Sequence, residues 1–276
     1  MKRGLLLFLL LPALSAADLF LPPSGGWDAG YEGNAAASAA TAALDGNWNH
    51  NNPSDIWSGS TSVVYTATVN EVSFLHIHDA LTSGDDRKFM FGYDLESLLG
   101  IVDDAFLDDG FTLHTRFRLP DGQGYGIHNS TKGMFNISQR SEDSFGMSLN
   151  NNGELLIGSN DGTGQGTVAA TVTGLTAWHE AWLTFSLVVS NDYQVTLYLD
   201  GDTTPAFQQT LTALQQGQNI GGGGFTREYT HNYLAFGLGS SAFTGNFDLD
   251  FIRFSDALLP PEEPVQAQPE ILAVAY

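Results

Sequence analysis

The sequence predicts an all-β protein built as a two-sheet antiparallel sandwich. Helical periodicity is nearly absent, and short runs of alternating apolar and polar residues end at Gly, Asn or Asp. An alternation with a period of two places one set of side chains on each face of a strand, which is the pattern of a half-buried sheet. About a dozen such runs separated by short turns favour two packed sheets.

The clearest predicted strand covers residues 111–119. Its odd-numbered positions are mostly large and apolar, whereas its even-numbered positions carry Thr112, His114, Arg116 and Arg118. We therefore expect the first set to face the core and the second to face outward. Further strands are expected at residues 62–69, 72–77, 88–93, 133–139, 144–149, 154–158, 182–189, 193–199, 233–238 and 246–254.

The two ends of the chain differ in composition from the middle. Lys2 and Arg3 precede an apolar run at residues 5–11, and small residues follow. This pattern is typical of an export signal cleaved before Asp18; the alternative interpretation is an apolar helix of the folded domain. The end of the chain is rich in Pro and Glu. The sequence thus predicts a secreted or cell-surface protein with a signal peptide at 1–17, a single sandwich domain at 18–259 and an extended tail at 260–276.

Net charge argues against two classes of partner. The chain has 31 Asp and Glu against 10 Lys and Arg, a formal charge of −21. Such a chain repels nucleic acid and anionic membranes, so we expect neither as a partner, and no membrane insertion after signal removal. The acidity fits a role in solubility, and it also fits Ca²⁺ binding, because the ligands of Ca²⁺ are oxygens. The chain contains no cysteine, which excludes disulfides and thiolate metal sites.

Several motifs follow one another in a characteristic order. Residues 178–182 read Trp-His-Glu-Ala-Trp, residues 197–201 read Leu-Tyr-Leu-Asp-Gly, and residues 243–254 follow a Phe-Gly-Leu-Gly run at 236–239. In this order they resemble the motifs of laminin-G-like jelly-roll domains, and the stretches 50–57, 86–88 and 107–113 are similar to exported bacterial proteins of that class. The resemblance implies a jelly-roll sandwich of the concanavalin A-like lectin or glucanase type, a fold that hosts binding modules and enzymes alike.

Trp178 and Trp182 begin and end the first of these motifs. A Trp entering a strand supplies the bulk needed between two sheets about 10 Å apart. We therefore expect both rings in the core between the sheets; the alternative is a platform for a ligand.

No catalytic motif is recognisable. Glucanases of similar fold carry a Glu-x-Asp-x-Glu run, but the corresponding strand here, residues 134–140, has no carboxylate. The lyase motifs of the fold and the Gly-x-Ser-x-Gly elbow of serine hydrolases are also missing. His76 and His78 share one face of a strand, which suits either a metal pair or two ordinary hydrogen-bonded histidines. The sequence gives no positive evidence for an enzyme.

A structural Ca²⁺ site is a further expectation. Asp250 lies where the resembling glucanases often have a calcium ligand, and Asp45 or Asp55 is the expected partner. The alternative is that Asp248 and Asp250 cap strands or pair with Arg253. A second acidic group, Asp103, Asp104, Asp108 and Asp109, is expected to form a solvated turn before the strand at 111–119.

The outward face of residues 111–119 is the expected glycan site. Arginines clamp carboxylates and sulfates, and tyrosine rings stack on sugars, so a local arginine pair would favour an anionic glycan. The alternative is that these arginines only pair with neighbouring carboxylates. If the register is glucanase-like, Asn136 and Ser138 lie beside this strand. The expected site residues are His114, Arg116, Arg118, Tyr125, His128, Asn136, Arg227 and Tyr229.

Three functions remain open at this stage. The first is a secreted, non-catalytic, lectin-like module that binds a glycan or matrix. The second is a polysaccharide-degrading enzyme, with a lyase favoured over a hydrolase. The third is a structural or adhesion protein of the cell surface. A base such as His or Tyr gathered with Arg would distinguish the second from the first.

Overall fold

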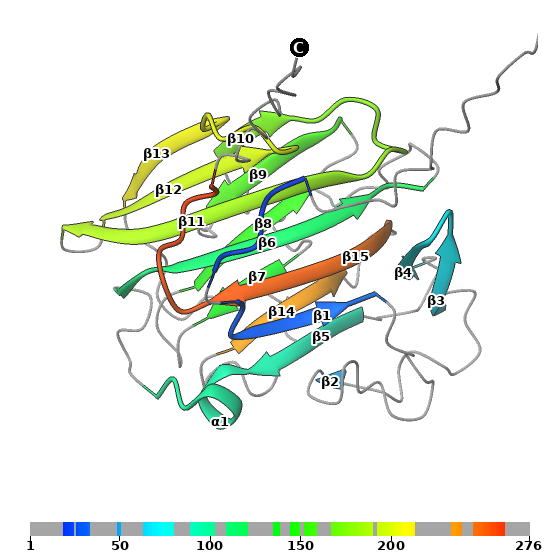
Figure 1. The fold of residues 1–276 in the computed structure, drawn as a ribbon, viewed down its shortest axis with the longest axis horizontal. Coiled ribbons are helices and arrows are strands. Elements are labelled where there is room, and N and C mark those ends of the chain that lie inside the picture. The colour runs from blue at the N-terminus through cyan, green and yellow to red at the C-terminus, as the bar shows by residue number, and fades with distance from the viewer. Residues whose placement is uncertain are drawn as a thin grey trace, which may run out of the picture.

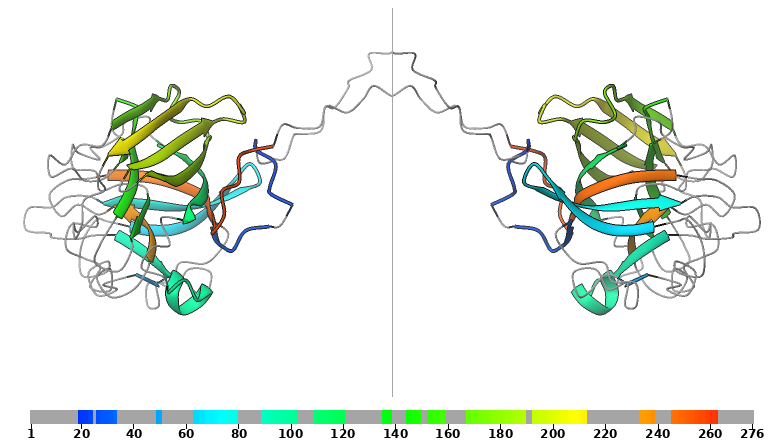
Figure 2. Two further views of the ribbon diagram at one scale, coloured as in Figure 1. Left: turned by 90° about the vertical axis from the view of Figure 1, so that its left-hand side faces the viewer. Right: turned by 90° about the vertical axis from the view of Figure 1, so that its right-hand side faces the viewer.

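Two antiparallel β-sheets stacked face to face form the described part of the molecule (Figure 1, Figure 2). The computed structural model describes residues 19–24, 26–33, 49–50, 63–79, 89–102, 109–120, 135–138, 144–149, 152–158, 167–189, 192–212, 233–238 and 245–262. One short helix, α1 (Leu95–Leu99), follows a strand of the second sheet. The predicted fold class, an all-β two-sheet antiparallel jelly-roll sandwich, is confirmed.

The first sheet, called sheet I, faces the viewer in Figure 1. Its strand order is β13 (Phe207–Thr212), β12 (Asp192–Leu199), β11 (His179–Val189), β6 (Phe111–Arg118), β15 (Gly245–Ser255), β4 (Val72–Asp79) and β3 (Val63–Val69). The short strand β1 (Ala29–Glu32) also pairs with β15. The face of sheet I that points away from the second sheet is called the outer face.

The second sheet, sheet II, lies behind sheet I in Figure 1. Its strand order is β10 (Thr167–Thr171), β9 (Glu154–Gly158), β8 (Ser144–Leu149), β7 (Phe135–Ser138), β14 (Tyr233–Leu238), β5 (Phe89–Asp94) and β2 (Asn49–His50). Because β7 pairs only within this sheet, with β14 and β8, Asn136 and Ser138 do not neighbour β6. The prediction that they lie beside residues 111–119 is wrong.

Every strand expected from the sequence is present, whereas four strands and α1 were not expected. The unexpected strands are β1, β2, β10 and β13. Two of them are very short, and β10 and β13 consist mainly of Thr, Gln and Ala without an apolar alternation. Their pairing is specified by neighbouring strands rather than by their own residues.

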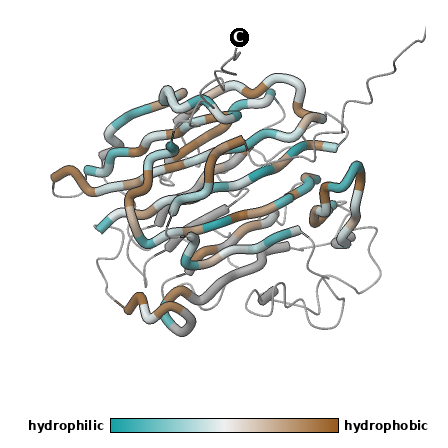
Figure 3. The backbone as a smooth tube through the Cα atoms, viewed as in Figure 1, coloured by the Kyte–Doolittle hydropathy of each residue, from teal (hydrophilic) through white to brown (hydrophobic). Residues whose placement is uncertain are grey.

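The core lies between the two sheets and follows the predicted alternation. Phe111, Leu113 and Phe117 of β6 are fully buried there, with Leu183 and Phe185 of β11. Figure 3 shows hydrophilic and hydrophobic positions interleaved along the strands of sheet I. The outward residues of β6 are not solvated, however, since His114 and Arg116 are buried as well. Another layer of the chain must therefore cover the outer face.

A β-bulge at Asp250 divides strand β15 into two halves. Opposite β6, Leu249 pairs with Phe117 and Phe251 with Arg116, so that Asp250 is the extra residue. The bulge shifts the alternation by one position, because Leu249 and Ile252 both belong to the core between the sheets. Phe251 is thereby placed on the outer face.

The residues before β1, 19–24 and 26–28, are called the N-terminal segment, and this segment covers part of the outer face. In Figure 1 it passes in front of β11 and β6 before it enters β1. The first half of β15 pairs with β4, and the second half pairs with β1. Gly33, just after β1, donates its backbone N–H to the carbonyl of Asp250 at the bulge. The bulge thus marks the point where β1 replaces β4 as the neighbour of β15.

Candidate functional site

Two adjoining groups of polar and aromatic side chains occupy the outer face of sheet I. One is buried and centred on Glu180 of β11; the other is partly exposed and lies over β3, β4 and the adjoining ends of β15 and β6. In the register of β11 with β6, Glu180 lies opposite Arg116, and Trp182 opposite His114. Residues opposite one another in neighbouring strands share a face, so these four side chains are brought together.

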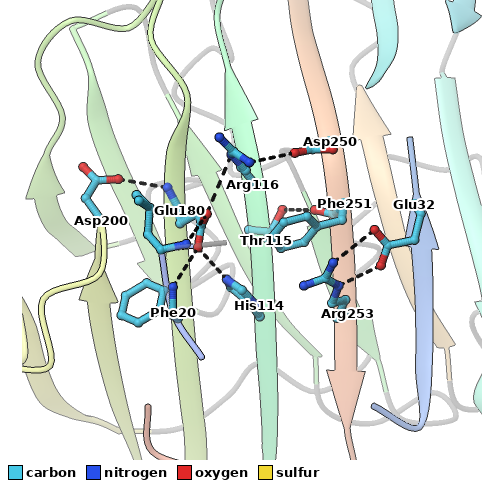
Figure 4. Close-up of polar contacts among 11 residues, drawn as sticks. Phe20, Glu32, His114, Thr115, Arg116, Glu180, Asp200, Asp250, Phe251 and Arg253 are labelled. Atoms are coloured by element: carbon cyan, nitrogen blue, oxygen red, sulfur yellow. Dashed lines mark hydrogen bonds and ion pairs between the residues drawn. The ribbon is translucent and has the colours of Figure 1, made fainter. Parts of the chain in front are cut away.

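Glu180 is a fully buried carboxylate with partners from two parts of the chain (Figure 4). Its Oε1 accepts the backbone N–H of Leu19 at 2.8 Å, and its Oε2 accepts that of Phe20 at 3.3 Å. His114 Nε2 lies 3.0 Å from Oε2, and Arg116 Nε lies 3.7 Å from Oε1. A buried carboxylate is tolerated only when it is paired and hydrogen-bonded, and this one is. It anchors the N-terminal segment to sheet I.

Aromatic rings enclose His114 on this face. The rings of Phe20 and Trp27, from the N-terminal segment, lie 5.7 Å from its imidazole. Trp182 lies at 4.9 Å and Phe251 at 4.7 Å. His114 is 0% exposed. Its side chain is therefore enclosed by the protein and cannot contact a ligand.

The position of Trp182 differs from the prediction. It is buried, as expected, but it lies on the outer face and not between the sheets, because the neighbouring Ala181 and Leu183 fill the core positions. Its indole N–H donates to the carbonyl of Leu259 at 2.7 Å. Thr112 also bonds the segment after β15, accepting the N–H of Leu259 at 2.8 Å. Both ends of the described chain thus cover the centre of this face.

Two of the sequence motifs, at residues 178–182 and 197–201, meet at Asp200. Its Oδ2 lies 2.9 Å from His179 Nδ1, and its Oδ1 accepts the backbone N–H of Glu180 at 2.9 Å. The hydrogen bond to Asp200 raises the pKa of His179 above its ordinary value, although burial opposes this. Burial would raise the pKa of Asp200, but the bonds from His179 and Glu180 outweigh it and lower that pKa. The motifs therefore fix the strand that presents Glu180.

A second group lies farther along the same face. Asp248 of β15 is 1% exposed and joins two cationic or basic groups: its Oδ1 lies 2.6 Å from His76 Nδ1, and its Oδ2 accepts Arg118 Nε at 2.7 Å. The guanidinium of Arg118 stacks 4.6 Å from the centre of the Trp178 ring and 4.8 Å from that of Phe74. Trp178 is thus partly exposed and packs against arginine, contrary to the expectation of a core position.

Tyr65 and His78 extend this group toward solvent. Tyr65 of β3 is 47% exposed, and its ring lies 4.8 Å from His76 in the neighbouring strand. The rings of His76 and His78 are parallel at 6.3 Å. Among aromatic side chains whose exposure is described, only Tyr65 is largely exposed. We call the whole group the outer-face patch: Tyr65, Phe74, His76, His78, Arg118, Trp178 and Asp248.

Four of the eight residues predicted for the glycan site are described, and they do not form an exposed face together. His114 and Arg116 are buried, and Arg118 is held by Asp248. Asn136 is in the opposite sheet. The remaining predicted residues, Tyr125, His128, Arg227 and Tyr229, lie outside the described residues. The sequence had singled out His76 and His78, but Tyr65 was missed because only the register of β3 with β4 brings it beside them.

The aspartates of β15 considered for the calcium site are paired with basic side chains. Asp250 pairs with Arg116 at 3.2 Å, Asp248 is taken by Arg118 and His76, and Asp45 and Asp55 lie outside the described residues. Within the described part of the chain, no three His, Asp or Glu side chains form a group that could hold a metal ion. Arg253, which the alternative interpretation named as their partner, forms an ion pair with Glu32 at 2.7 Å. Calcium therefore stays a prediction from the sequence.

Of the expected acidic turn, only Asp109 is described, and its side chain is exposed. Asp103, Asp104 and Asp108 lie outside the described residues. In the described part of the molecule, no helix has the length and apolar character needed to cross a membrane.

No family model matches this chain, and no curated protein matches its sequence. Several solved structures are similar to this chain over most of its length. One is a carbohydrate esterase of the Shiga toxin-encoding bacteriophage phi24B (12% identity, 82% of this chain and 95% of that chain, TM-score 0.46). Another is an endo-β-1,4-glucuronan lyase of the fungus Trichoderma reesei (14%, 83% and 95%, TM-score 0.47). A third is the alginate lyase Aly36B (12%, 83% and 96%, TM-score 0.45).

Proposed function

We propose that this chain is an exported, non-catalytic, lectin-like module that binds a glycan through the outer-face patch. The observation that carries the proposal is the exposed ring of Tyr65 beside His76, an imidazole that the buried Asp248 holds in place. A sugar ring presents C–H groups on its faces and hydroxyls at its edges. An exposed aromatic ring bordered by fixed polar groups matches both features.

The patch is held rigidly before a ligand arrives. Asp248 fixes His76 through Nδ1, which leaves Nε2 as the ring nitrogen that can meet a sugar hydroxyl. The same carboxylate fixes Arg118 against the Trp178 ring. Side chains already ordered in the free protein lose little entropy on binding, and such preorganisation favours affinity.

Replacement of Tyr65 tests this proposal. Tyr65→Ala removes the exposed ring and leaves the buried network of Asp248 intact, so we expect glycan binding to weaken by about tenfold or more, the equivalent of about 1.4 kcal/mol. Binding is measured by isothermal titration calorimetry against a panel of soluble polysaccharides. Because Tyr65 is exposed, the melting temperature should hardly change.

Tyr198→Ala is the matched control. Tyr198 is a partly buried tyrosine of β12 that faces outward on the same sheet, but β11, β6 and β15 separate it from β4. We expect the control to bind like the parent. Equal binding by the Tyr65 variant and the parent would contradict the assignment of the patch. A parent that binds no member of the panel would leave the structural or adhesion role as the better hypothesis.

A second candidate function is a polysaccharide lyase, and the pair His76–Asp248 favours it. A histidine oriented by a carboxylate through one ring nitrogen can act as a general base through the other, and Arg118 and Tyr65 lie close to it. The test is incubation with uronic-acid polysaccharides while the absorbance of unsaturated products is followed. Product formation that is lost in His76→Gln would replace the binding proposal by this one.

A further inference from the structure

Every described cationic side chain is already engaged by a carboxylate. Arg116, Arg118 and Arg253 are the only Lys or Arg residues within the described ranges, and all three lie on the outer face of sheet I. Arg116 lies between Glu180 and Asp250, and Arg253 forms two hydrogen bonds with Glu32, at 2.7 and 3.1 Å. The arginines of this face therefore create no local excess of positive charge.

Arg118 is the only one of the three within the outer-face patch, and its surroundings are already filled. Its Nε donates to Asp248 at 2.7 Å, while its guanidinium plane is stacked near Trp178 and Phe74. The side chain of Asp248 is 1% exposed, and that of Arg118 is 20% exposed. An incoming carboxylate or sulfate would meet a guanidinium whose charge Asp248 already compensates, and would approach the negative charge of Asp248.

We infer that the ligand of the outer-face patch is a neutral oligosaccharide rather than a uronic-acid or sulfated one; this inference rests on the proposed glycan-binding function. A neutral sugar requires only stacking and hydrogen bonds to its hydroxyls, which Tyr65 and His76 can supply. An anionic polymer would also meet the repulsion of a chain with a formal charge of −21. The anionic ligand expected from the arginine pair is thereby replaced, because those arginines are paired.

A neutral ligand would also favour the binding module over the lyase. A lyase removes the proton next to a uronic carboxylate and needs a cation or hydrogen-bond donors to stabilise the charge that develops there. Arg118 is paired with the same Asp248 that orients His76. A neutral glycan also lacks the carboxylate that makes this proton acidic. The binding module is therefore favoured over the lyase.

The experiment compares the parent with Asp248→Asn on neutral, uronic-acid and sulfated polysaccharides at low and high salt. We expect the parent to prefer neutral polysaccharides by about tenfold or more, with little salt dependence. Asp248→Asn removes the competing charge and releases Arg118, so its affinity for anionic polysaccharides should rise by about tenfold at low salt and fall again at high salt. The double variant Asp248→Asn with Arg118→Gln should lose this gain.

The outcomes separate the inference from the function on which it rests. A parent that binds uronic-acid or sulfated polysaccharides more tightly than neutral ones overturns the inference and leaves the glycan-binding function in place. A parent that binds no polysaccharide overturns both. Because the parent alone decides between these results, the test stands even if Asp248→Asn does not fold; a folded Asp248→Asn variant without the gain would show that the charge of Asp248 does not set the specificity.

Discussion

Glu180 is the residue on which the outer face of sheet I depends. Its carboxylate bonds Leu19 and Phe20, which lie about 160 residues away in the sequence, and contacts His114 and Arg116 on the adjacent strand. It is 0% exposed, so these contacts replace water entirely. One side chain thus joins the N-terminal segment to the centre of the sheet.

The substitution Glu180→Gln should strongly destabilise the protein. The amide has one oxygen and one NH₂ group, so it can accept only one of the two backbone N–H groups, and it lacks the negative charge that compensates the buried Arg116. Breaking a buried pair in this way costs about 3 kcal/mol or more of unfolding free energy. Urea denaturation measures the change. The exposed Glu71→Gln, in the turn between β3 and β4, is the control and should change it by less than about 0.5 kcal/mol. Equal changes in the two variants would show that the contacts of Glu180 contribute little to the free energy of unfolding.

The contacts of Glu180 were not predicted from the sequence, for a physical reason. The sequence assigned His114, Arg116 and Arg118 correctly to the outward face of one strand, because alternation is a local property. Which carboxylates those residues meet depends on strand pairing over long separations, such as the 130 residues between Arg118 and Asp248. The arginine pair therefore had the two interpretations considered above, a ligand clamp or a structural pair, and only the pairing of β6 with β11 and β15 decides between them.

At the scale of elements, the bulge in β15 and the strand β1 depend on each other. The bulge at Asp250 turns its carbonyl toward the N–H of Gly33, and β1 then continues the sheet where β4 diverges. Tyr31 of β1 is fully buried and packs against Phe236 of sheet II at 5.2 Å. The N-terminal segment therefore completes the core as well as the outer cover.

A glycine is required at residue 33 because the backbones of β4 and β15 approach it closely. A Cβ added there would lie 2.5 Å from the Cα of Phe74 and 2.8 Å from the carbonyl oxygens of Ser73 and Asp250. Backbone atoms cannot move aside as a flexible side chain can, so we expect Gly33→Ala to cost about 1–3 kcal/mol of unfolding free energy. Gly30→Ala, in the same strand, is the matched control, because its nearest neighbour would lie at an ordinary 3.4 Å. Urea denaturation of both variants checks the expectation, which a fully stable Gly33 variant would refute.

The sequence predicted the strands that have strong alternation and missed those that do not. β6 and β12 were correctly placed because their apolar residues recur at every second position. The four residues of β1 carry too little pattern to be recognised. The bulge was also missed: two apolar neighbours, Phe251 and Ile252, look like a break in the alternation until the register with β6 shows that they face opposite sides.

At the scale of the whole molecule, short-range and long-range electrostatics act in opposite directions. The ion pairs of the outer face are close and largely buried, whereas the formal charge of −21 belongs mostly to carboxylates spread over the chain. Salt screens separated, exposed charges far more than buried pairs, since the Debye length falls from about 30 Å at 0.01 M to about 10 Å at 0.1 M ionic strength. Added salt should therefore weaken the repulsion while leaving the pairs that hold the N-terminal segment nearly unchanged.

This balance predicts that sodium chloride stabilises the protein. Between about 0.01 and 0.2 M, we expect the melting temperature to rise by about 2–4 °C, which corresponds to roughly 1 kcal/mol for a chain of this size. Differential scanning calorimetry gives the measurement, with sucrose at equal osmolality as the uncharged comparison. Glu180→Gln, although less stable, should show the same rise, because the pairs it disturbs are buried and hardly screened. A melting temperature that falls with salt would mean that exposed ion pairs outweigh the repulsion among the excess carboxylates, and the assignment of the stabilising pairs to the buried outer face would be wrong.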